Sequence, residues 1–189
     1  RLLDTSNSIY SLERLGMTES DREKLEKMIF KPHGMILSTG PTGSGKSTSL
    51  YSILKKINQP DIHIITVEDP VEYRIEKIRQ VQLNRKAGMS FASGLRSILR
   101  QDPDVIMVGE MRDVETISLA LSAAETGHLV FGTLHINTTI NAITRIADAF
   151  AEHQHRNDLL ALLEANADDT AGEAAHRGHV ALSEANALS

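Results

Sequence analysis

Residues 40–47 constrain this chain more than any other stretch of its sequence. They read Gly-Pro-Thr-Gly-Ser-Gly-Lys-Ser and fit the pattern G-x-x-x-x-G-K-[ST], the phosphate-binding loop of nucleoside triphosphatases. Such a loop joins a buried strand to the N-terminus of a helix, so that successive backbone N–H groups point toward one polyphosphate. The pattern therefore predicts both a local fold and a ligand.

The flanks of the loop supply the structural context that the motif requires. Residues 35–37, Met-Ile-Leu, form a short apolar run that is typical of a buried strand. After the loop, Leu50, Ile53, Leu54 and Ile57 follow the spacing i, i+3, i+4 and i+7, which is one face of a helix. The alternative is a chance glycine-rich turn, which would not need these flanks. We therefore expect the chain to bind ATP or GTP.

The motif also assigns roles within the loop. Lys46 is expected to reach the β- and γ-phosphates, and the Ser47 hydroxyl is expected to ligate Mg²⁺. The predicted nucleotide-binding residues of the loop are Gly40, Pro41, Thr42, Gly43, Ser44, Gly45, Lys46, Ser47 and Thr48.

Composition excludes several other classes of protein. The chain has 189 residues, enough for one α/β domain with appendages, and no cysteine, which rules out a disulfide framework or thiolate metal site within it. No apolar run approaches the roughly 18 residues of a membrane span. Residues 151–189 hold seven acids and two bases and so account for the whole formal net charge of −5. The neutral remainder argues against a non-specific nucleic-acid surface.

Strand-like and helix-like patterns alternate along the chain, which favours a mostly parallel sheet covered by helices. A helix is predicted to start at Thr18 and to carry Leu25, Met28 and Ile29 on one side. Gly127 is expected to end the predicted helix 113–126. The remaining predicted strands are 62–67, Val105–Val108 and Leu129–Leu134, and the remaining predicted helices are Phe91–Leu99, 113–126 and 140–150.

Two acids are candidates for the chemistry. Glu110 follows the apolar run 105–108, where phosphoryl-transfer ATPases place an acid that holds hydrated Mg²⁺ or polarises the attacking water. Gly109 stands where an Asp is usual, and the alternative is that Glu110 caps the next helix. Glu68 follows the predicted strand 62–67 at the edge where ligands collect in open α/β sheets. It is a candidate general base, and a solvated turn is its alternative.

Two histidines flank the predicted strand Leu129–Leu134. His135 follows the strand, and a histidine there can sense or position a γ-phosphate. His128 precedes the strand. For a lone histidine beside a strand, a structural role is the alternative.

Together these motifs resemble one family, the secretion ATPases of type II secretion and type IV pilus systems, which are hexameric traffic ATPases of the bacterial cytoplasm. After the phosphate loop comes an aspartate box at residues 66–72, Thr-Val-Glu-Asp-Pro-Val-Glu. Residues 95–104 read Leu-Arg-Ser-Ile-Leu-Arg-Gln-Asp-Pro-Asp, and residues 109–113 read Gly-Glu-Met-Arg-Asp. A histidine box runs from Thr-Gly-His to Thr-Leu-His at residues 126–135. The resemblance covers residues 1–150.

This resemblance implies an α/β fold with a RecA-like P-loop core, a mostly parallel sheet flanked by helices. Residues 1–20 look like an inter-domain linker, and residues 21–150 look like the motor domain. Residues 151–189 match the family poorly, and we expect them to form an acidic, alanine-rich helical tail outside that core. The chain opens on Arg1, and we expect it to be part of a longer protein.

By the same resemblance, Glu110 and Glu68 are the catalytic acids, and Glu110 and Ser47 are the predicted metal-site residues. His128 and His135 belong to the nucleotide-sensing box. Three arginines are weaker candidates for phosphate or inter-subunit contacts: Arg96, Arg100 and Arg112. The cofactors implied are ATP and Mg²⁺.

The function implied is ATP hydrolysis by a ring ATPase that powers protein secretion or assembly of a type IV pilus or pseudopilus. The implied partners are identical subunits in a homohexamer and the platform and assembly proteins of the inner membrane, with no direct nucleic acid. The implied location is cytoplasmic, peripheral at the inner membrane through those partners. A pilus-retraction ATPase and a DNA-translocating or conjugative ring ATPase remain alternatives. A small-molecule kinase and a non-hydrolysing nucleotide sensor are two further classes.

Overall fold

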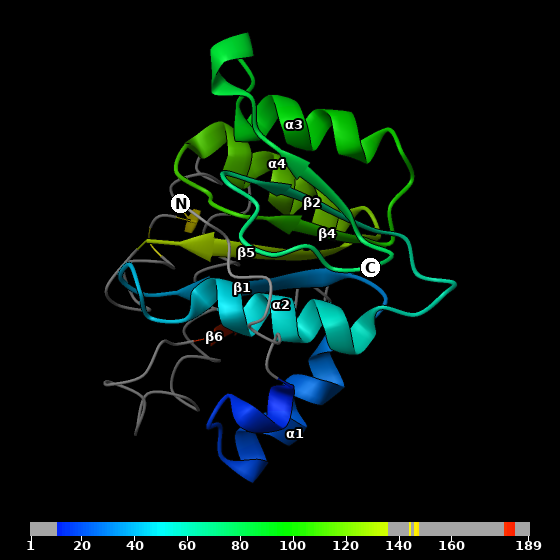
Figure 1. The fold of residues 1–189 in the computed structure, drawn as a ribbon, viewed down its shortest axis with the longest axis vertical. Helices are drawn as coiled ribbons and strands as arrows, with labels where there is room; N and C mark the ends of the chain where they lie inside the picture. Colours follow the sequence, from blue (N-terminus) through cyan, green and yellow to red (C-terminus); the bar gives the residue numbers. More distant parts are fainter. Residues whose placement is uncertain (1–10, 136–143, 145, 148–179, 184–189) are drawn as a thin grey trace.

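A mixed sheet organises the part of the chain that the structure describes, residues 11–135, 144, 146, 147 and 180–183 of a computed structural model (Figure 1). The strands lie in the order β3-β2-β4-β5-β1-β6. The first five are parallel to one another, and β6 is antiparallel to β1. They are β1 (Gly34–Thr39), β2 (Ile64–Glu68), β3 (Arg79–Gln82), β4 (Val105–Val108), β5 (Leu129–Leu134) and β6 (Val180–Ser183).

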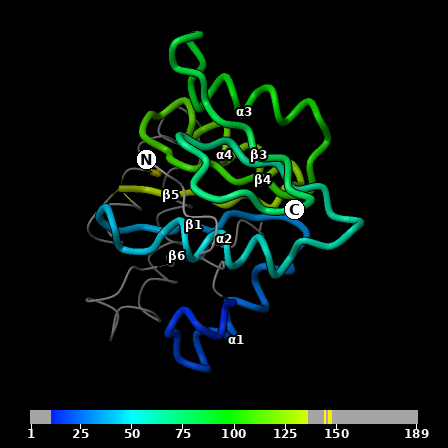
Figure 2. Tube along the Cα trace, in the orientation of Figure 1, coloured from blue at the N-terminus to red at the C-terminus, as the bar shows by residue number. Residues whose placement is uncertain are grey.

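Helices cover both faces of this sheet. Helices α3 and α4 lie on one side, and α2 and α1 lie on the other (Figures 1 and 2). The described helices are α1 (Glu19–Ile29), α2 (Lys46–Ile57), α3 (Phe91–Leu99) and α4 (Val114–Glu125), with single 3₁₀ turns at η1 (Leu12–Arg14) and η2 (Arg85–Ala87). The predicted α/β fold with a mostly parallel sheet is confirmed.

Alternation along the strands divides the hydrophobic core in two. In β4, Ile106 and Val108 pack with α3 and α4, whereas Val105 and Met107 pack with α1 and α2. Successive side chains of a strand point to opposite faces, so a strand covered on both sides is apolar at most of its positions. Burying each such side chain stabilises the fold by about 1.5–3 kcal/mol. The short apolar runs that predicted the strands have this origin.

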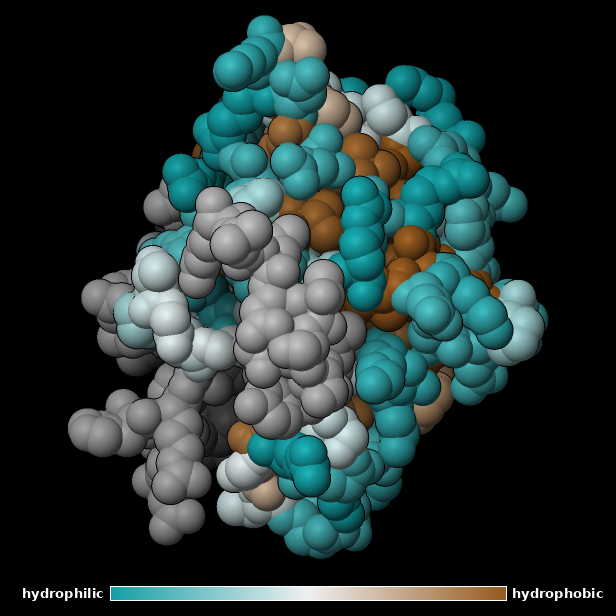
Figure 3. All heavy atoms as spheres, viewed as in Figure 1, coloured by the Kyte–Doolittle hydropathy of each residue, from teal (hydrophilic) through white to brown (hydrophobic). Residues whose placement is uncertain are grey.

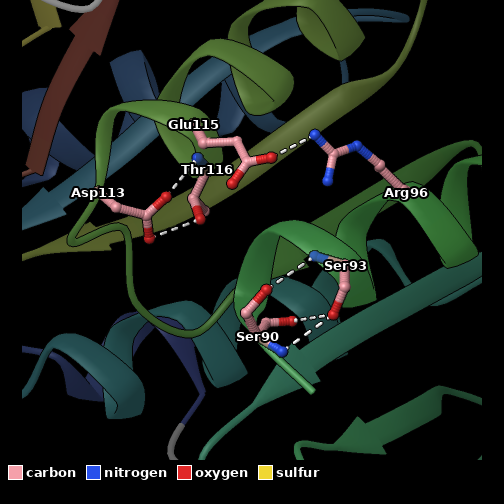
Figure 4. A network of polar contacts seen from close by, with 6 residues as sticks. All are labelled: Ser90, Ser93, Arg96, Asp113, Glu115 and Thr116. Atoms are coloured by element: carbon pink, nitrogen blue, oxygen red, sulfur yellow. Dashed lines mark hydrogen bonds and ion pairs between the residues drawn. The ribbon is translucent and has the colours of Figure 1, made fainter. Parts of the chain in front are cut away.

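Local signals in the sequence place the helix ends. Thr18 accepts a hydrogen bond from the backbone N–H of Asp21 at 3.2 Å and begins α1, as predicted. Figure 4 shows Ser90 and Ser93 forming a reciprocal capping box at the start of α3, and Asp113 capping α4. Side-chain oxygens at these positions satisfy backbone N–H groups that have no partner within the helix. Polar caps therefore fix where the helices begin.

The predicted elements that fall on described residues are present. Phe91–Leu99, Val105–Val108 and Leu129–Leu134 have the bounds that we predicted. Gly127, with φ of 108°, follows α4 in a conformation that favours glycine, as expected at a helix end. Strand β2 ends one residue later than predicted, at Glu68.

Strand β3 was not predicted, because it has no apolar run. Of its four residues, Gln80 is buried, Val81 is half-buried, and Arg79 and Gln82 are exposed. It is the outermost described strand on its side of the sheet. The molecular face in Figure 3 is largely hydrophilic, with hydrophobic atoms showing over α3 and β3. An edge strand that is half-covered in this way gives only a weak sequence signal.

The predicted tail differs from our expectation at the residues that are described. Val180–Ser183 form strand β6, not the helix that we predicted, and they pair with the edge of β1. An edge strand presents a row of unpaired backbone groups, which is a ready template for another strand. The other residues of 151–189 lie outside the described part of the chain. The boundaries of the motor domain and the tail stay predictions.

The two other predicted end segments are partly described. Within the predicted linker, residues 1–20, Leu12 is buried in the core that contains α1 and α2. Within the predicted helix 140–150, Thr144, Ile146 and Ala147 are helical, and the rest lies outside the described residues.

Candidate functional site

The carboxyl ends of the parallel strands share one edge of the sheet, and the predicted site lies there. Strand β1 ends at Thr39 and leads into the phosphate loop, and β4 leads to Glu110. Strand β5 lies between them and ends before His135. Ligands bind at this edge in open α/β sheets. The strand order thus places the loop, the histidine and the acid side by side.

Three glycines allow the shape of the phosphate loop. Gly40, Gly43 and Gly45 have φ values of 142°, 82° and 89°, which L side chains rarely adopt. Gly45 stands at the N-cap of α2, and its carbonyl accepts a hydrogen bond from the N–H of Ser49 at 2.9 Å. The loop therefore ends on the N-terminus of a helix, which favours anions.

Lys46 lies inside the curve of this loop. Its Nζ donates to the carbonyl oxygens of Gly40 and Pro41, each at 2.8 Å, and its residue exposure is 8%. Burial lowers the pKa of the Lys46 ammonium, and the negative charge of Glu110 opposes that shift. Lys46 and Glu110 therefore lie close enough for the charge of one to act on the other.

Two serines of the loop carry hydroxyls that suit a phosphate and its metal. Ser44 Oγ is buried and has no hydrogen-bond partner among the described residues, as expected of a group that faces a ligand. Ser47 Oγ donates to Glu72 Oε1 at 3.1 Å. Thr48 follows in the first turn of α2, half-buried. The loop residues predicted from sequence are therefore gathered at one point.

Glu110 is the centre of the acid side of the site. Its Oε1 forms an ion pair with Arg112 Nε and lies 3.4 Å from His135 Nε2. The pairing with Glu110 raises the pKa of the Arg112 guanidinium. The alternative that Glu110 only caps the next helix is wrong, because Asp113 caps α4.

Close packing explains why glycine precedes Glu110. Gly109 N–H donates to the carbonyl of Val67 at 2.8 Å. A Cβ at position 109 would lie 3.1 Å from that carbonyl oxygen and 3.2 Å from Glu68 Cα. An Asp at this position would therefore need β2 and the end of β4 to separate. The departure from the usual motif has a steric cause.

The two histidines of the box lie at opposite ends of the same strand, β5. His135 belongs to the site, as predicted. His128 precedes β5, its ring Nδ1 lies 3.0 Å from the carbonyl of Ala123 in α4, and its own carbonyl accepts from Gly34 N–H at the start of β1. The six residues of β5 separate it from His135 by roughly 20 Å. His128 therefore lies at the end of β5 away from the phosphate loop of its own chain, and its role in nucleotide sensing stays a prediction.

Glu68 has different surroundings from those that we predicted. Its residue exposure is 3%, and its carboxylate accepts hydrogen bonds from Tyr51 Oη, Thr66 Oγ1 and, at 3.2 Å, Gln80 Nε2. Burial raises the pKa of the Glu68 carboxyl, and these hydrogen bonds oppose the shift. A carboxylate enclosed by three donors is not placed to activate water at the loop. These surroundings do not support a general base at Glu68, and its catalytic role stays a prediction.

Glu72 is the acid of the aspartate box that faces the loop, and we did not single it out from sequence. It is exposed, and it contacts Ser47, the predicted ligand of Mg²⁺. The available signal was its membership in the box. Spacing alone does not say which of Glu68 and Glu72 faces the phosphate loop, because this depends on contacts with Tyr51 in α2.

The three candidate arginines have different positions. Arg112 lies in the site against Glu110 and near Asp69. Arg96 is exposed on α3 and pairs with Glu115 of α4 (Figure 4). Arg100 stands at the C-cap of α3 and is exposed. Of the three, only Arg112 reaches the acid side of the site.

The donor set fits a metal held jointly with phosphate. Within the described ranges, no group of three or more His, Asp or Glu side chains lies close enough together to hold a metal ion. Mg²⁺ in ATPase sites is bound by few protein oxygens together with substrate phosphates and water. Ser47 Oγ suits that arrangement.

None of the described helices has the length and apolar content that crossing a bilayer requires.

A glycine-rich loop at one strand, an acid two strands away and helices on both faces together define a RecA-like P-loop nucleotide-binding core. The chain belongs to the family described as Type II/IV secretion system protein, whose sequence model matches residues 1–165.

Two relatives show the degree of similarity. The chain is 59% identical over 148 residues to Type II secretion system protein E of Aeromonas hydrophila, in an alignment that covers 78% of this chain and 30% of the relative. It is 53% identical over 148 residues to Type II secretion system ATPase E of Vibrio cholerae serotype O1, covering 78% and 29%. The chain thus spans less than a third of the length of these relatives.

Solved structures agree on the fold. The pilus retraction motor PilT, crystallised with bound ADP, has a TM-score of 0.71 and 47% identity, over 81% of this chain and 44% of that chain. The ATPase DotB of Legionella pneumophila has a TM-score of 0.65 and 34% identity, over 79% and 42%. The VirB11 ATPase of Brucella suis, at 22% identity and a TM-score of 0.55, shares the fold.

Proposed function

We propose that this chain is the nucleotide-hydrolysing core of a ring ATPase that powers protein secretion or the assembly of a type IV pilus or pseudopilus. The observation that carries the proposal is that the phosphate loop follows β1 and Glu110 follows β4 at the same end of the sheet, with only β5 between the two strands. Membership of the Type II/IV secretion system protein family supports the biological setting.

The substrate is ATP, and each part of the site has a role in its hydrolysis. Lys46, the loop N–H groups and Ser44 Oγ bind the phosphates. Ser47 Oγ would hold Mg²⁺, which neutralises charge on the phosphate oxygens when bound. Glu110 and Glu72 orient the attacking water or accept its proton. Catalysis of this kind depends on positioning and on charge neutralisation more than on covalent chemistry.

The assembly that we propose is a homohexamer at the cytoplasmic face of the inner membrane, bound there through platform and assembly proteins. The names of the relatives support a secretion setting. In rings of this type, arginines supplied by a neighbouring subunit stabilise the transition-state charge. Turnover should therefore depend on assembly, even though the phosphate loop and both acids come from one chain.

A retraction motor of the same family is the second candidate, and the 47% identity to PilT favours keeping it. A DNA-translocating or conjugative ATPase is a third, and the neutral charge of residues 1–150 speaks against it. DNA-stimulated turnover would favour the third candidate.

The test is steady-state phosphate release over a dilution series of the protein, with and without DNA. We expect turnover per chain to rise with protein concentration and to be insensitive to DNA. Constant turnover per chain would contradict the ring. Absence of ATP binding in calorimetry would contradict the assignment of the site.

A further inference from the structure

Residues 69–78, between β2 and β3, contain no helix or strand, yet buried side chains hold their backbone. Tyr51 Oη accepts from the N–H of Glu72 at 3.1 Å. Gln80 bonds to this segment twice: its Oε1 accepts from Ile75 N–H at 2.8 Å, and its Nε2 donates to the carbonyl of Tyr73 at 2.8 Å. Buried backbone groups outside regular structure need such partners. Two side chains therefore fix this irregular segment at three points.

Glu68 links these two side chains. Tyr51 donates its hydroxyl proton to Glu68 Oε2, so the oxygen of the same hydroxyl is oriented to accept from Glu72. Gln80 Nε2 donates to Glu68 Oε1, which fixes the direction of its amide. All three side chains are buried, with residue exposures of 1% for Tyr51, 3% for Glu68 and 9% for Gln80. A fully satisfied buried network of this kind rigidifies its surroundings.

The held segment ends at the site. The Glu72 whose N–H is bound by Tyr51 also accepts the hydroxyl proton of Ser47 in the phosphate loop. Tyr51 and Ser47 belong to the same helix, α2. The backbone and the side chain of Glu72 are thus both fixed against α2, the first by a part-buried contact and the second by an exposed one.

We propose that Glu68 is a positioning residue, which acts through Tyr51 and Gln80 to fix residues 72–75 and so holds the Glu72 carboxylate at the phosphate loop. The inference rests on the proposed function for its kinetic consequence. The clamp itself, defined as Glu68, Tyr51 and Gln80, is a property of the folded chain and can be measured without nucleotide.

Hydrogen exchange of the folded chain without nucleotide tests the clamp. In Tyr51→Phe, the N–H of Glu72 loses its acceptor, and its exchange should speed up by roughly two- to tenfold. Tyr73→Phe is the matched control, because it removes a hydroxyl that takes no part in this network of described residues while the ring packed edge-on against Tyr51 remains. Unchanged exchange at Glu72 in Tyr51→Phe would overturn the clamp.

Kinetics test the positioning role. In Tyr51→Phe, kcat for ATP should fall roughly tenfold or more, because small displacements of a catalytic group are costly, and the Kd for nucleotide should stay within about twofold. Glu68→Gln keeps the size of the side chain and should show the same split. An unchanged kcat in both variants, or equal losses of affinity and turnover in both, would overturn the role.

A double-variant cycle separates action through Glu72 from action elsewhere. If the clamp works by holding Glu72, Tyr51→Phe should cause little further loss of kcat in a Glu72→Gln background. Independent, multiplicative losses would overturn the proposal. If the wild-type chain failed to bind or hydrolyse ATP, the proposed function would fail, while the exchange experiment would still decide the clamp.

Discussion

Glu110 and His135, which follow the adjacent strands β4 and β5, lie with Oε1 and Nε2 3.4 Å apart. The same carboxylate oxygen also pairs with Arg112. Glu110 thus has two partners at the edge that carries the phosphate loop. A carboxylate restrained in this way is suited to one orientation of a water or a hydrated metal ion.

Replacing Glu110 by Gln should separate hydrolysis from binding. The variant keeps the size of the side chain but loses the charge, so ATP turnover should fall by roughly 10²–10⁴. ATP should still bind, because Lys46 and the loop amides are unchanged. Phosphate release and calorimetry measure the two effects. Glu125→Gln, an exposed acid at the far end of α4, is the control. Full turnover in Glu110→Gln would remove this residue from the mechanism.

Replacing Lys46 by Ala should weaken nucleotide affinity roughly tenfold or more, because each charge-assisted hydrogen bond to phosphate contributes about 1.5–3 kcal/mol. Circular dichroism should show an intact fold, and calorimetry should show the loss of affinity. Lys55→Ala, an exposed lysine on the same helix, should bind as wild type does. Equal affinity in the Lys46 and Lys55 variants would contradict the assignment of the loop.

Glu68 should make stability depend on pH. Burial raises the pKa of its carboxyl, which in the unfolded chain titrates near 4.5. Between that pH and the raised value, the folded state holds a proton that the unfolded state has lost, so the Glu68 contribution to the free energy of unfolding falls as pH rises. Glu68→Gln lacks this contribution.

Thermal midpoints of wild type and Glu68→Gln, measured from about pH 4 to about pH 8, check this dependence. The difference between the two proteins should move in favour of the variant as pH rises and then level off. Parallel curves over the whole range would show that the Glu68 carboxyl titrates alike in the folded and unfolded states.

Gly132 in β5 allows the loop strand and the acid turn to approach each other. A Cβ at this position would lie 2.4 Å from Met111 Cε and 3.3 Å from Leu37 Cδ2. Gly132→Ala should therefore destabilise the fold by about 1 kcal/mol, because the flexible end of the Met111 side chain must move within a buried site. Urea unfolding measures the loss. Adding Met111→Ala should recover part of it, and purely additive losses would contradict this account.

Much of the site was predictable because its signals are local. The loop motif, the apolar runs and the polar caps each depend on a few neighbouring residues, and Lys46, Ser47, Glu110 and His135 all lie at the predicted edge. The buried surroundings of Glu68 could not be predicted in this way, because they depend on the topology. Ile65 and Val67 face α3, so alternation along the strand directs Glu68 toward α2. The sequence does not show that the Tyr51 hydroxyl of α2 lies within hydrogen-bond distance of Glu68.

The position of His128 and the presence of β3 were not predicted, for different reasons. His128 shares a motif with His135, and shared membership suggested shared location, although a whole strand separates the two. Strand β3 has one buried residue in four and gains its place by pairing with β2, a non-local contact that leaves no periodic pattern.

The division of the core into two has a consequence for genetics. Val130 and Phe131 are neighbours in β5, yet Val130 packs with α3 and α4 behind the acid turn, whereas Phe131 packs with α2 behind the phosphate loop. Second-site suppressors of a substitution at Val130 should therefore map to one side of the sheet, and those of a substitution at Phe131 to the other. Substitutions at two adjacent codons therefore affect different halves of the hydrophobic core.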